Sequence, residues 1–454
     1  MSLERQLGLP TATLAVVAGM IGTGIFFTTG IILGMAHNAL LVLVLWVIGA
    51  LAALTGALSY AELATMWPEA GGEYVYLKRI YGLLPSFLTG WISLLVGFSA
   101  PVAISAIAFV KYLNEFCQNV MPSAPFVPSL LSNIWGQKMI AATLILALSS
   151  IHIVGVRVGG AVQNVLTAVK LFIVTTFIGF GLFKAEWSSA ERLVAAYPAA
   201  GEAQGVGIPT MGLALLIIMF SYSGWNAAAY IAGEIKNPEK NLPRALLWGT
   251  IITSILYLGL NIVFLMSAPG HRLMGQEAVG AIAAQHLFGS YASRFYTLGI
   301  ALVLLSSISV EMMLGPRVSY AMAKDKMIFR CLHGVSPTFG TPSAAICLQM
   351  SLAIVYVLIG SAQAILEYTG FALAVFPLLA VTGLIVARKS YPELPRPYRV
   401  FHPGIPFFYI VLTLSMLIAG LLTMKHTSWC AVAVILAGVP VYYLWREFLL
   451  REEP

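Results

Sequence analysis

The sequence predicts an all-α polytopic membrane protein of about twelve transmembrane helices. Of its 454 residues, 59% are apolar and only 9% are charged, whereas a soluble domain carries roughly 25% charged residues. The apolar residues are grouped in blocks of about 20, the length that an α-helix needs to cross a bilayer. Strands of an outer-membrane barrel would be about 10 residues long and would alternate polar with apolar residues. The sequence lacks that alternation, so helices in a lipid bilayer are expected.

Polar, glycine and proline clusters separate the apolar blocks from one another. The predicted spans cover residues 11–35, 39–66, 82–113, 138–154, 158–183, 208–235, 243–267, 291–323, 343–360, 364–388, 404–424 and 428–448.

Lysine and arginine are unevenly divided between the two sets of predicted loops. Seventeen of the 25 lie on the side that also holds both termini, seven lie on the other side, and Lys170 lies within a span. Because cytoplasmic loops carry the excess of positive charge, we expect both termini to be cytoplasmic in a multi-pass protein of the cytoplasmic membrane. The net charge of +7 then reflects topology, and without a basic run no nucleic-acid partner is expected.

Two of the predicted spans are interrupted near their middle. The first contains three glycines within residues 19–24, and the sixth contains the polar stretch Phe220-Ser-Tyr-Ser-Gly-Trp-Asn226. Glycines also serve close helix packing, but breaks at corresponding positions indicate a transporter of two inverted repeats with its substrate at the unwound points. We expect a single domain with repeats over about 11–183 and 208–388, followed by two extra helices over about 404–448.

The chemistry of an unwound helix indicates the class of substrate. Unwinding frees N–H groups at the start of one half-helix, and these groups with the positive end of the helix dipole bind a carboxylate. It also frees carbonyl groups at the end of the other half-helix, which accept hydrogen bonds from an ammonium group. A zwitterionic α-amino acid fits this arrangement without a charged side chain in the pocket.

Four stretches resemble the amino acid–polyamine–organocation (APC) superfamily, over essentially the whole chain. The first is Gly22-Thr23-Gly24-Ile25-Phe26, which resembles the family's G-[STA]-G-I-F signature. The others are residues 59–63 with 68–74, residues 220–226 with 233–243, and residues 315–325. The chain is similar to bacterial permeases and to light subunits of heteromeric (L-type) amino acid transporters. This resemblance implies a LeuT-type 5+5 inverted repeat with helices 1 and 6 broken, and alternating access for amino acids.

The resemblance also implies roles for the residues at the two breaks. The N–H groups that would bind the substrate carboxylate are those of Thr23, Gly24 and Ile25. The carbonyl groups that would receive the ammonium are those of Met20, Ile21, Phe220, Ser221 and Ser223. Phe220 matches the family's aromatic gate, Ser223 replaces a Gly, Ala or Asp of many members, and Gly224 and Asn226 complete the expected set.

Lys170 lies in the middle of the fifth predicted span. It is about twelve residues from either end, too far for its side chain to reach the interface. The resemblance places its ammonium where sodium-coupled relatives bind a cation, near the carbonyls of Ala18 or Gly19 and the hydroxyl of Ser306 or Ser307. It therefore implies sodium independence.

Glu311 departs from the family pattern, which usually has a small apolar residue at this point of the eighth span. Four roles are open for its carboxylate: a partner for Lys170, a protonatable coupling group, a counter-charge for a cationic substrate, or an acid facing a water-filled cavity.

The cysteine positions and the lack of catalytic or metal-ligand patterns indicate which partners and cofactors to expect. Light subunits carry a cysteine in a Pro-x-Cys-Pro motif that links them to a glycoprotein, and here Pro122-Ser123-Ala124-Pro125 has alanine at that point. Cys117 lies too early to replace it, so no covalent heavy subunit is expected. The spans contain no nucleophile–base or metal-ligand pattern, so neither an enzyme nor a metal or cofactor is expected.

The function predicted is sodium-independent secondary transport of L-amino acids across the cytoplasmic membrane by alternating access. Exchange of small or medium neutral amino acids is the leading form. The alternatives are a proton-coupled amino acid symporter, and a cationic amino acid or polyamine transporter that uses Glu311.

Overall fold

A computed structural model describes residues 3–120, 131, 133–185, 191–194, 197, 207–276, 278–359, 362–423 and 425–452 of the chain. Throughout these residues the regular structure is helical, and the one β-bridge is an isolated contact between Leu7 and Ile235. The predicted all-α class is confirmed.

The helices follow the predicted blocks in order. In the first part of the chain they are α1 (Leu9–Met20), α2 (Gly24–Ala36), α3 (Ala39–Met66), α4 (Glu73–Tyr81), α5 (Leu83–Ile92), the π-turn η1 (Ser93–Phe98), α6 (Ser99–Val120), α8 (Ile134–Val154) and α9 (Val156–Lys184). In the second part they are α10 (Ile208–Tyr222), α11 (Ala227–Tyr230), η3 (Ala232–Glu234), α12 (Pro238–Ser267), α13 (Gly270–Leu273), α14 (Val279–Lys324), η4 (Arg330–His333), α15 (Ser343–Ile359), α16 (Ala362–Ser390), α17 (Gly404–Thr423) and α18 (Lys425–Glu452).

Most of these helices are long and apolar enough to cross a membrane. Nine qualify singly among the described residues, and α1 with α2 forms a tenth, bent by 41° at the break between them. The remaining two predicted spans coincide with the shorter apolar helices α10 and α15, of 15 and 17 residues. The polytopic membrane protein is thus confirmed, while the count of twelve crossings stays a prediction.

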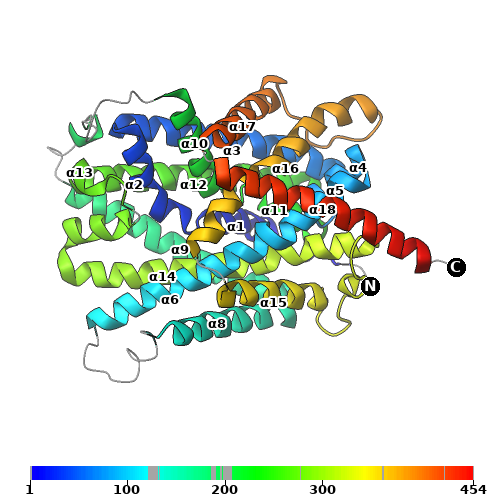
Figure 1. The fold of residues 1–454 in the computed structure, drawn as a ribbon, viewed down its shortest axis with the longest axis horizontal. Helices are drawn as coiled ribbons and strands as arrows, with labels where there is room; N and C mark the ends of the chain where they lie inside the picture. Colours follow the sequence, from blue (N-terminus) through cyan, green and yellow to red (C-terminus); the bar gives the residue numbers. More distant parts are fainter. Residues whose placement is uncertain are drawn as a thin grey trace.

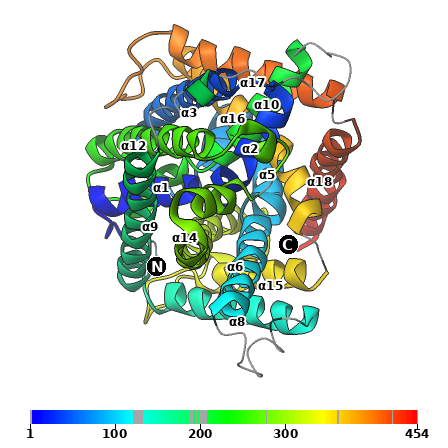
Figure 2. The ribbon, with the colours of Figure 1, turned by 90° about the vertical axis from the view of Figure 1, so that its left-hand side faces the viewer.

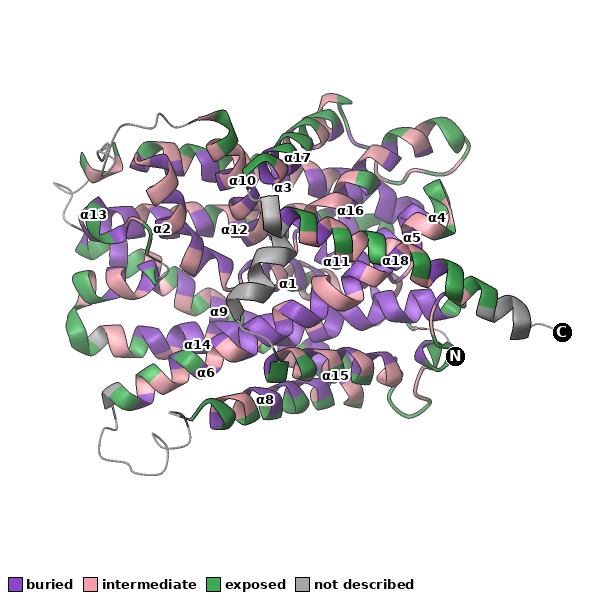
Figure 3. Ribbon diagram, in the orientation of Figure 1, coloured by how far each residue is buried: buried purple, intermediate pink, exposed green. Residues whose placement is uncertain are grey.

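The long helices run roughly alongside one another, and both ends of the chain lie at the same end of the bundle (Figure 1). Viewed from the end of the bundle, α1 and α14 lie in the middle, with α3, α8, α9, α12, α15, α17 and α18 around them (Figure 2). In its most apolar window α14 is 78% buried, whereas α18 is 22% buried, and Figure 3 shows the same contrast. The centre of the bundle is therefore built on α14 and the broken first span.

Three predicted spans differ in detail from the observed helices. The span at 82–113 contains the π-turn η1, and the span at 291–323 extends back through a kink at Gly289 to Val279. The span at 208–235 does not resume as a long helix, because α11 has only four residues and is followed by a 3₁₀ turn. These local departures decide which backbone groups face the interior of the bundle.

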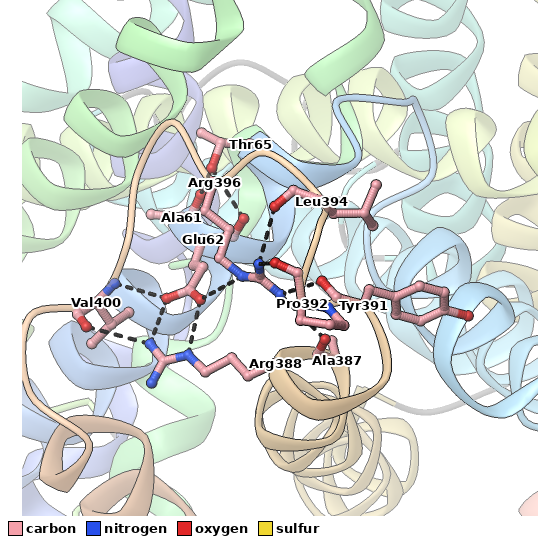
Figure 4. A network of polar contacts seen from close by, with 10 residues as sticks. All are labelled: Ala61, Glu62, Thr65, Ala387, Arg388, Tyr391, Pro392, Leu394, Arg396 and Val400. Atoms are coloured by element: carbon pink, nitrogen blue, oxygen red, sulfur yellow. Dashed lines mark hydrogen bonds and ion pairs between the residues drawn. The ribbon is translucent and has the colours of Figure 1, made fainter.

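A buried carboxylate joins two parts of the bundle that are far apart in sequence (Figure 4). Glu62 of α3 accepts hydrogen bonds of 2.9 and 2.6 Å from the Arg388 guanidinium of α16 and one of 2.7 Å from the Val400 N–H. Arg396 lies 3.6 Å from the same carboxylate. The Glu62 side chain is fully buried, so the network ties α3 to the segment between α16 and α17.

We expect Glu62→Gln to lower the thermal stability of the protein in detergent. The change removes the charge that Arg388 and Arg396 face, at a cost of about 2 kcal/mol. Glu69→Gln is the matched control, because the Glu69–Arg79 pair (2.9 Å) is exposed and such pairs contribute about 1 kcal/mol at most. Equal melting temperatures for the two variants would show that the Glu62 network does not support the fold.

Candidate functional site

A pocket opens where the two interrupted helices meet in the middle of the bundle. Its walls come from the α1–α2 break, the α10–α11 break, η1 and α6, α14, and the neighbouring faces of α16 and α17. Of the predicted site residues, those that line it are Met20, Thr23, Gly24, Phe220, Ser221, Ser223, Gly224, Asn226, Ser307 and Glu311. Ile21, Ile25, Lys170 and Ser306 are absent from this lining, so any role of theirs is exerted through the backbone or from behind the pocket wall.

The two breaks lie against each other. A Cβ atom on Gly24 would lie 2.7 Å from the Ser221 Oγ and 2.8 Å from its Cα. A Cβ atom on Gly224, whose φ of +93° favours glycine, would lie 2.5 Å from the Gly19 carbonyl carbon. Each break therefore requires a glycine to let the other break approach.

Tyr257 of α12 holds the two breaks together. Its hydroxyl is within hydrogen-bond distance of the Met20 carbonyl at the end of α1 and lies 2.8 Å from the Ser221 carbonyl near the end of α10. A tyrosine hydroxyl has one proton to donate, so the two carbonyls share it. Sequence reasoning missed Tyr257, because a tyrosine in an apolar span carries no signal of what its hydroxyl contacts.

The start of α2 presents its N–H groups toward the pocket. The first four N–H groups of a helix have no acceptor within the helix, and Thr23 occupies the position before α2 without a side-chain cap. The first contact of this turn is a 3.1 Å bond from the Phe26 N–H to the Thr23 carbonyl. Thr23 and Gly24 line the pocket as predicted. This end of the helix is suited to binding an anionic group.

Four of the five predicted carbonyl acceptors already receive one or two hydrogen bonds. Met20 and Ser221 share the Tyr257 hydroxyl, and the Phe220 carbonyl accepts from the Ser223 N–H (3.1 Å) and hydroxyl (2.7 Å). The Ile21 carbonyl accepts from the Lys170 ammonium and the Ser307 hydroxyl. A carbonyl oxygen has two lone pairs, so the Phe220 and Ile21 carbonyls are fully used, whereas those of Met20, Ser221 and Ser223 retain capacity for an ammonium group.

Lys170 lies fully buried behind the α1 end of the pocket. Its ammonium donates to the Ala18 carbonyl (3.1 Å), the Ile21 carbonyl (2.5 Å) and the Ser307 hydroxyl (3.0 Å). The predicted contacts with Ala18 and Ser307 are confirmed, while Ile21 takes the place expected for Gly19.

Ser306 points elsewhere, toward Gln163 Nε2 at 3.2 Å and the Thr167 hydroxyl at 3.3 Å. Although Lys170 and Glu311 are both near the pocket, no ion pair within 4.0 Å joins them in the described part of the chain. The two opposite charges still attract each other, so the interpretation of Glu311 as a partner of Lys170 stays a prediction, without a direct contact.

Glu73 is a pocket residue that sequence reasoning did not single out. It is the first residue of α4, and its carboxylate accepts hydrogen bonds from Tyr60 (2.8 Å), Asn226 (2.6 Å) and Tyr230 (2.7 Å). Burial raises the pKa of this carboxyl, and the three hydrogen bonds oppose that rise. The preceding Gly72, with φ +55°, allows the close approach to the Tyr230 ring. In the sequence, the glycine directly before Glu73 was the one sign that this acid lies in a closely packed turn.

A buried ion pair joins α14 to the turn that follows the second break. Arg317 of α14 and Glu234 of η3 form two hydrogen bonds of 2.7 and 3.0 Å, with both side chains buried. The Glu234 carbonyl also accepts 2.8 Å bonds from the N–H groups of Gln6 and Leu7. The segment before α1 is thus attached to the end of the sixth predicted span.

We expect Tyr257→Phe to lower the melting temperature in detergent. Without the hydroxyl, the Met20 and Ser221 carbonyls lose their shared donor inside the bundle, at a cost of about 1–3 kcal/mol. Tyr356→Phe in α15 is the control, since no hydrogen bond of the Tyr356 hydroxyl is found among the described residues. If the two variants melt at the same temperature, the Tyr257 bridge contributes nothing measurable.

Comparison with known proteins agrees with this geometry. The amino acid permease family matches residues 7–440. The serine/threonine exchanger SteT of Bacillus subtilis (strain 168) is 31% identical over 451 residues, which cover 97% of both chains. The human b(0,+)-type amino acid transporter 1 and the human large neutral amino acids transporter small subunit 2 are each 28% identical over 98% of this chain, covering 89% and 81% of those proteins.

These relatives are transporters and not enzymes, and they match the chain across both breaks and the pocket between them. The chain therefore belongs to the amino acid permease family of the APC superfamily, and it is a multi-pass membrane protein that transports amino acids.

Proposed function

We propose that this protein exchanges small or medium neutral L-amino acids across the cytoplasmic membrane, without sodium, by alternating access. The observation that carries the proposal is the meeting of two broken helices around one pocket, where the N–H groups at the start of α2 have no side-chain cap among the described residues. A carboxylate is the group that such a helix end binds. The name of the similar SteT protein, a serine/threonine exchanger, supports exchange and small neutral substrates.

In this proposal the amino acid head binds between the breaks. Its carboxylate accepts from the N–H groups of Thr23, Gly24 and Ile25. Its ammonium donates to the surrounding carbonyls, which are those of Met20, Ile21, Phe220, Ser221 and Ser223. The Ile21 and Phe220 carbonyls must exchange one of their present donors for the ammonium. The side chain lies beside Gly224 and Asn226, and Phe220 covers the substrate as a gate. The pocket lining supports this arrangement for eight of these ten residues, all except Ile21 and Ile25.

The expected architecture gives alternating access its mechanical basis. Residues 11–183 and 208–388 form the two inverted repeats, residues 404–448 add two helices, and both termini are cytoplasmic. The location of both ends of the chain at one end of the bundle supports an even number of crossings (Figure 1).

Lys170 provides the reason for sodium independence. Its ammonium is surrounded by two carbonyl oxygens and a hydroxyl oxygen, the kind of oxygen ligands that hard metal cations take. A permanently tethered cation in this place joins α9, α1 and α14 without a bound ion.

The transporter works without a covalently linked heavy subunit in this proposal. The motif that would carry the linking cysteine, residues 122–125, lies outside the described residues. The support comes from the sequence, which has alanine at position 124 where the motif has cysteine. The SteT relative is named as an exchanger, whereas the large neutral amino acids transporter relative is named as a small subunit.

Counterflow in proteoliposomes tests the proposed function. Vesicles loaded with unlabelled serine, threonine and alanine should accumulate labelled threonine from outside, and empty vesicles should not, in the presence or absence of sodium. Accumulation by empty vesicles under an inward proton gradient would instead indicate symport. Uptake that requires sodium would contradict the role given to Lys170.

We expect Gly24→Val to abolish threonine counterflow, because a side chain here meets the Ser221 backbone and blocks the approach of the carboxylate to the N–H groups. Gly179→Val in α9 is the control, since a Cβ atom there has nothing within 4 Å. Normal uptake by Gly24→Val would show that the carboxylate does not bind at the start of α2.

We expect Lys170→Ala to reduce counterflow by about tenfold or more, because the Ala18 and Ile21 carbonyls lose a charged hydrogen-bond donor. Lys184→Ala is the control on the same helix, where the lysine is exposed at the end of α9. If Lys170→Ala transports at the normal rate, this lysine has no part in coupling α9 to the pocket.

A further inference from the structure

Four buried polar side chains form a connected set at one wall of the pocket. They are Tyr60 of α3, Glu73 of α4, Asn226 at the second break and Tyr230 of α11. Three of them, Glu73, Asn226 and Tyr230, line the pocket itself. Because buried polar groups need hydrogen-bond partners, the contacts within this set decide which atom each side chain turns toward the pocket.

The Glu73 carboxylate is the acceptor at the centre of this set. Its Oε1 accepts from the Tyr60 hydroxyl (2.8 Å) and the Asn226 amide (2.6 Å), and its Oε2 accepts from the Tyr230 hydroxyl (2.7 Å). An ionised carboxylate has no proton to donate, and its place in the first turn of α4 adds the favourable end of a helix dipole. Each of the three neighbours must therefore turn a donor toward Glu73.

These contacts fix the orientation of the Asn226 amide. The Tyr230 hydroxyl has one proton, which it gives to Glu73, so toward Asn226 it can only accept. The Asn226 Nδ2 lies 2.6 Å from the Glu73 Oε1 and 3.3 Å from the Tyr230 hydroxyl. Exchange of the amide nitrogen and oxygen would leave both acceptors without this donor and would place an oxygen against the carboxylate. The nitrogen is thus held on Glu73, and the oxygen is turned away from it.

The Asn226 Oδ1 atom is left for a ligand. Asn226 precedes the first residue of α11, where an asparagine oxygen commonly accepts from the helix N–H groups, but its side chain makes no such bond. In the described part of the chain no donor reaches this oxygen, and it is not among the buried oxygens that lack a partner. Since Asn226 lines the pocket, its oxygen is open to the pocket as an acceptor.

Backbone contacts hold Glu73 in the place that this orientation requires. The Gly71 N–H donates to the Tyr230 carbonyl at 3.0 Å. Gly72, with φ +55°, lies so close to the Tyr230 ring that a Cβ atom would be 2.7 Å from it. The start of α4 is therefore attached to α11 without the help of the carboxylate, and a substitution of Glu73 leaves this attachment in place.

We infer that Glu73 is a positioning residue for substrate selection. It holds the Asn226 amide so that the amide oxygen faces the bound amino acid and favours a side chain that donates a hydrogen bond, such as the hydroxyl of threonine. A methyl group of equal size would leave this oxygen unpaired, and sites built around a hydrogen bond discriminate against such analogues. The inference rests on the proposed function, because the substrate side chain lies beside Asn226 only when the amino acid head binds between the breaks.

The experiment compares threonine with valine, which has a methyl group in place of the hydroxyl and nearly the same shape. Each competes, unlabelled, with the counterflow of labelled alanine into proteoliposomes loaded with alanine. The measured quantity is the ratio of the concentrations of valine and threonine that halve the counterflow. This ratio is taken within each variant, so it does not depend on the amount of active protein.

In the unaltered protein we expect threonine to compete about fivefold better than valine. In Asn226→Ala the ratio should fall to about one, because the acceptor is lost. In Glu73→Gln it should fall below about twofold, because glutamine can turn its own N–H toward Asn226 and no longer fixes the amide. Glu73→Ala removes the carboxylate as well and should give the same fall, which keeps the test valid if one of the two variants does not fold.

Two variants serve as controls. Tyr60→Phe removes one donor to Glu73 but leaves the Asn226 amide on the same carboxylate, so the ratio should stay near fivefold at whatever rate this variant transports. Glu69→Gln removes an exposed carboxylate and should change neither the ratio nor the rate. An equal fall of the ratio in Tyr60→Phe and Glu73→Gln would show a general structural role of the set and would contradict the positioning role.

The remaining outcomes also overturn the inference, each in a recognisable way. If the unaltered protein exchanges alanine but takes threonine no better than valine, the inference is wrong and the proposed function stands. A preference that survives in Asn226→Ala would mean that another acceptor of the pocket, such as Glu311, binds the hydroxyl. A preference that is lost in Asn226→Ala but kept without the Glu73 carboxylate would show that Glu73 does not orient the amide. If the unaltered protein exchanges no amino acid, the proposed function itself fails.

Discussion

The structure depends on how backbone groups are satisfied where two helices stop in the middle of the bundle. In a membrane each unpaired N–H or C=O group has no water to bind, so two breaks within lipid-spanning segments require internal partners. Tyr257 supplies one donor shared by both breaks, and Lys170 with Ser307 supplies donors to the end of α1. The donors at the start of α2 have no such partner among the described residues, and they border the pocket between the breaks.

The two unwound segments are in close contact because glycines stand where they meet. Gly24 allows α2 to approach Ser221, and Gly224 allows the second break to approach Gly19. The Thr28 and Ser221 hydroxyls, 3.2 Å apart, add a polar contact on the same side. Because α12 contributes Tyr257 and α14 contributes Ser307, the unwound segments of the pocket wall are supported by continuous helices.

The buried charges divide into those that build the bundle and those that face the pocket. Glu62 with Arg388, and Glu234 with Arg317, are paired through two hydrogen bonds each, and such pairs join elements that are distant in sequence. Buried pairs are costly to break on one side only, so they favour a single arrangement of the helices they join. Glu311 differs from them, because it lines the pocket and forms no ion pair within 4.0 Å among the described residues.

The sequence alone determined the helical class, the order of the spans and the location of the two breaks, because hydrophobic block length and glycine clustering are local properties. It also identified most of the pocket lining around those breaks and two of the three Lys170 contacts. Only the tertiary structure decided that Ile21 accepts from Lys170, that Tyr257 bridges the breaks, and that Glu73 receives three hydrogen bonds. These contacts join side chains and backbone groups that are far apart in the sequence. A local sequence pattern does not predict which of them come within hydrogen-bond distance.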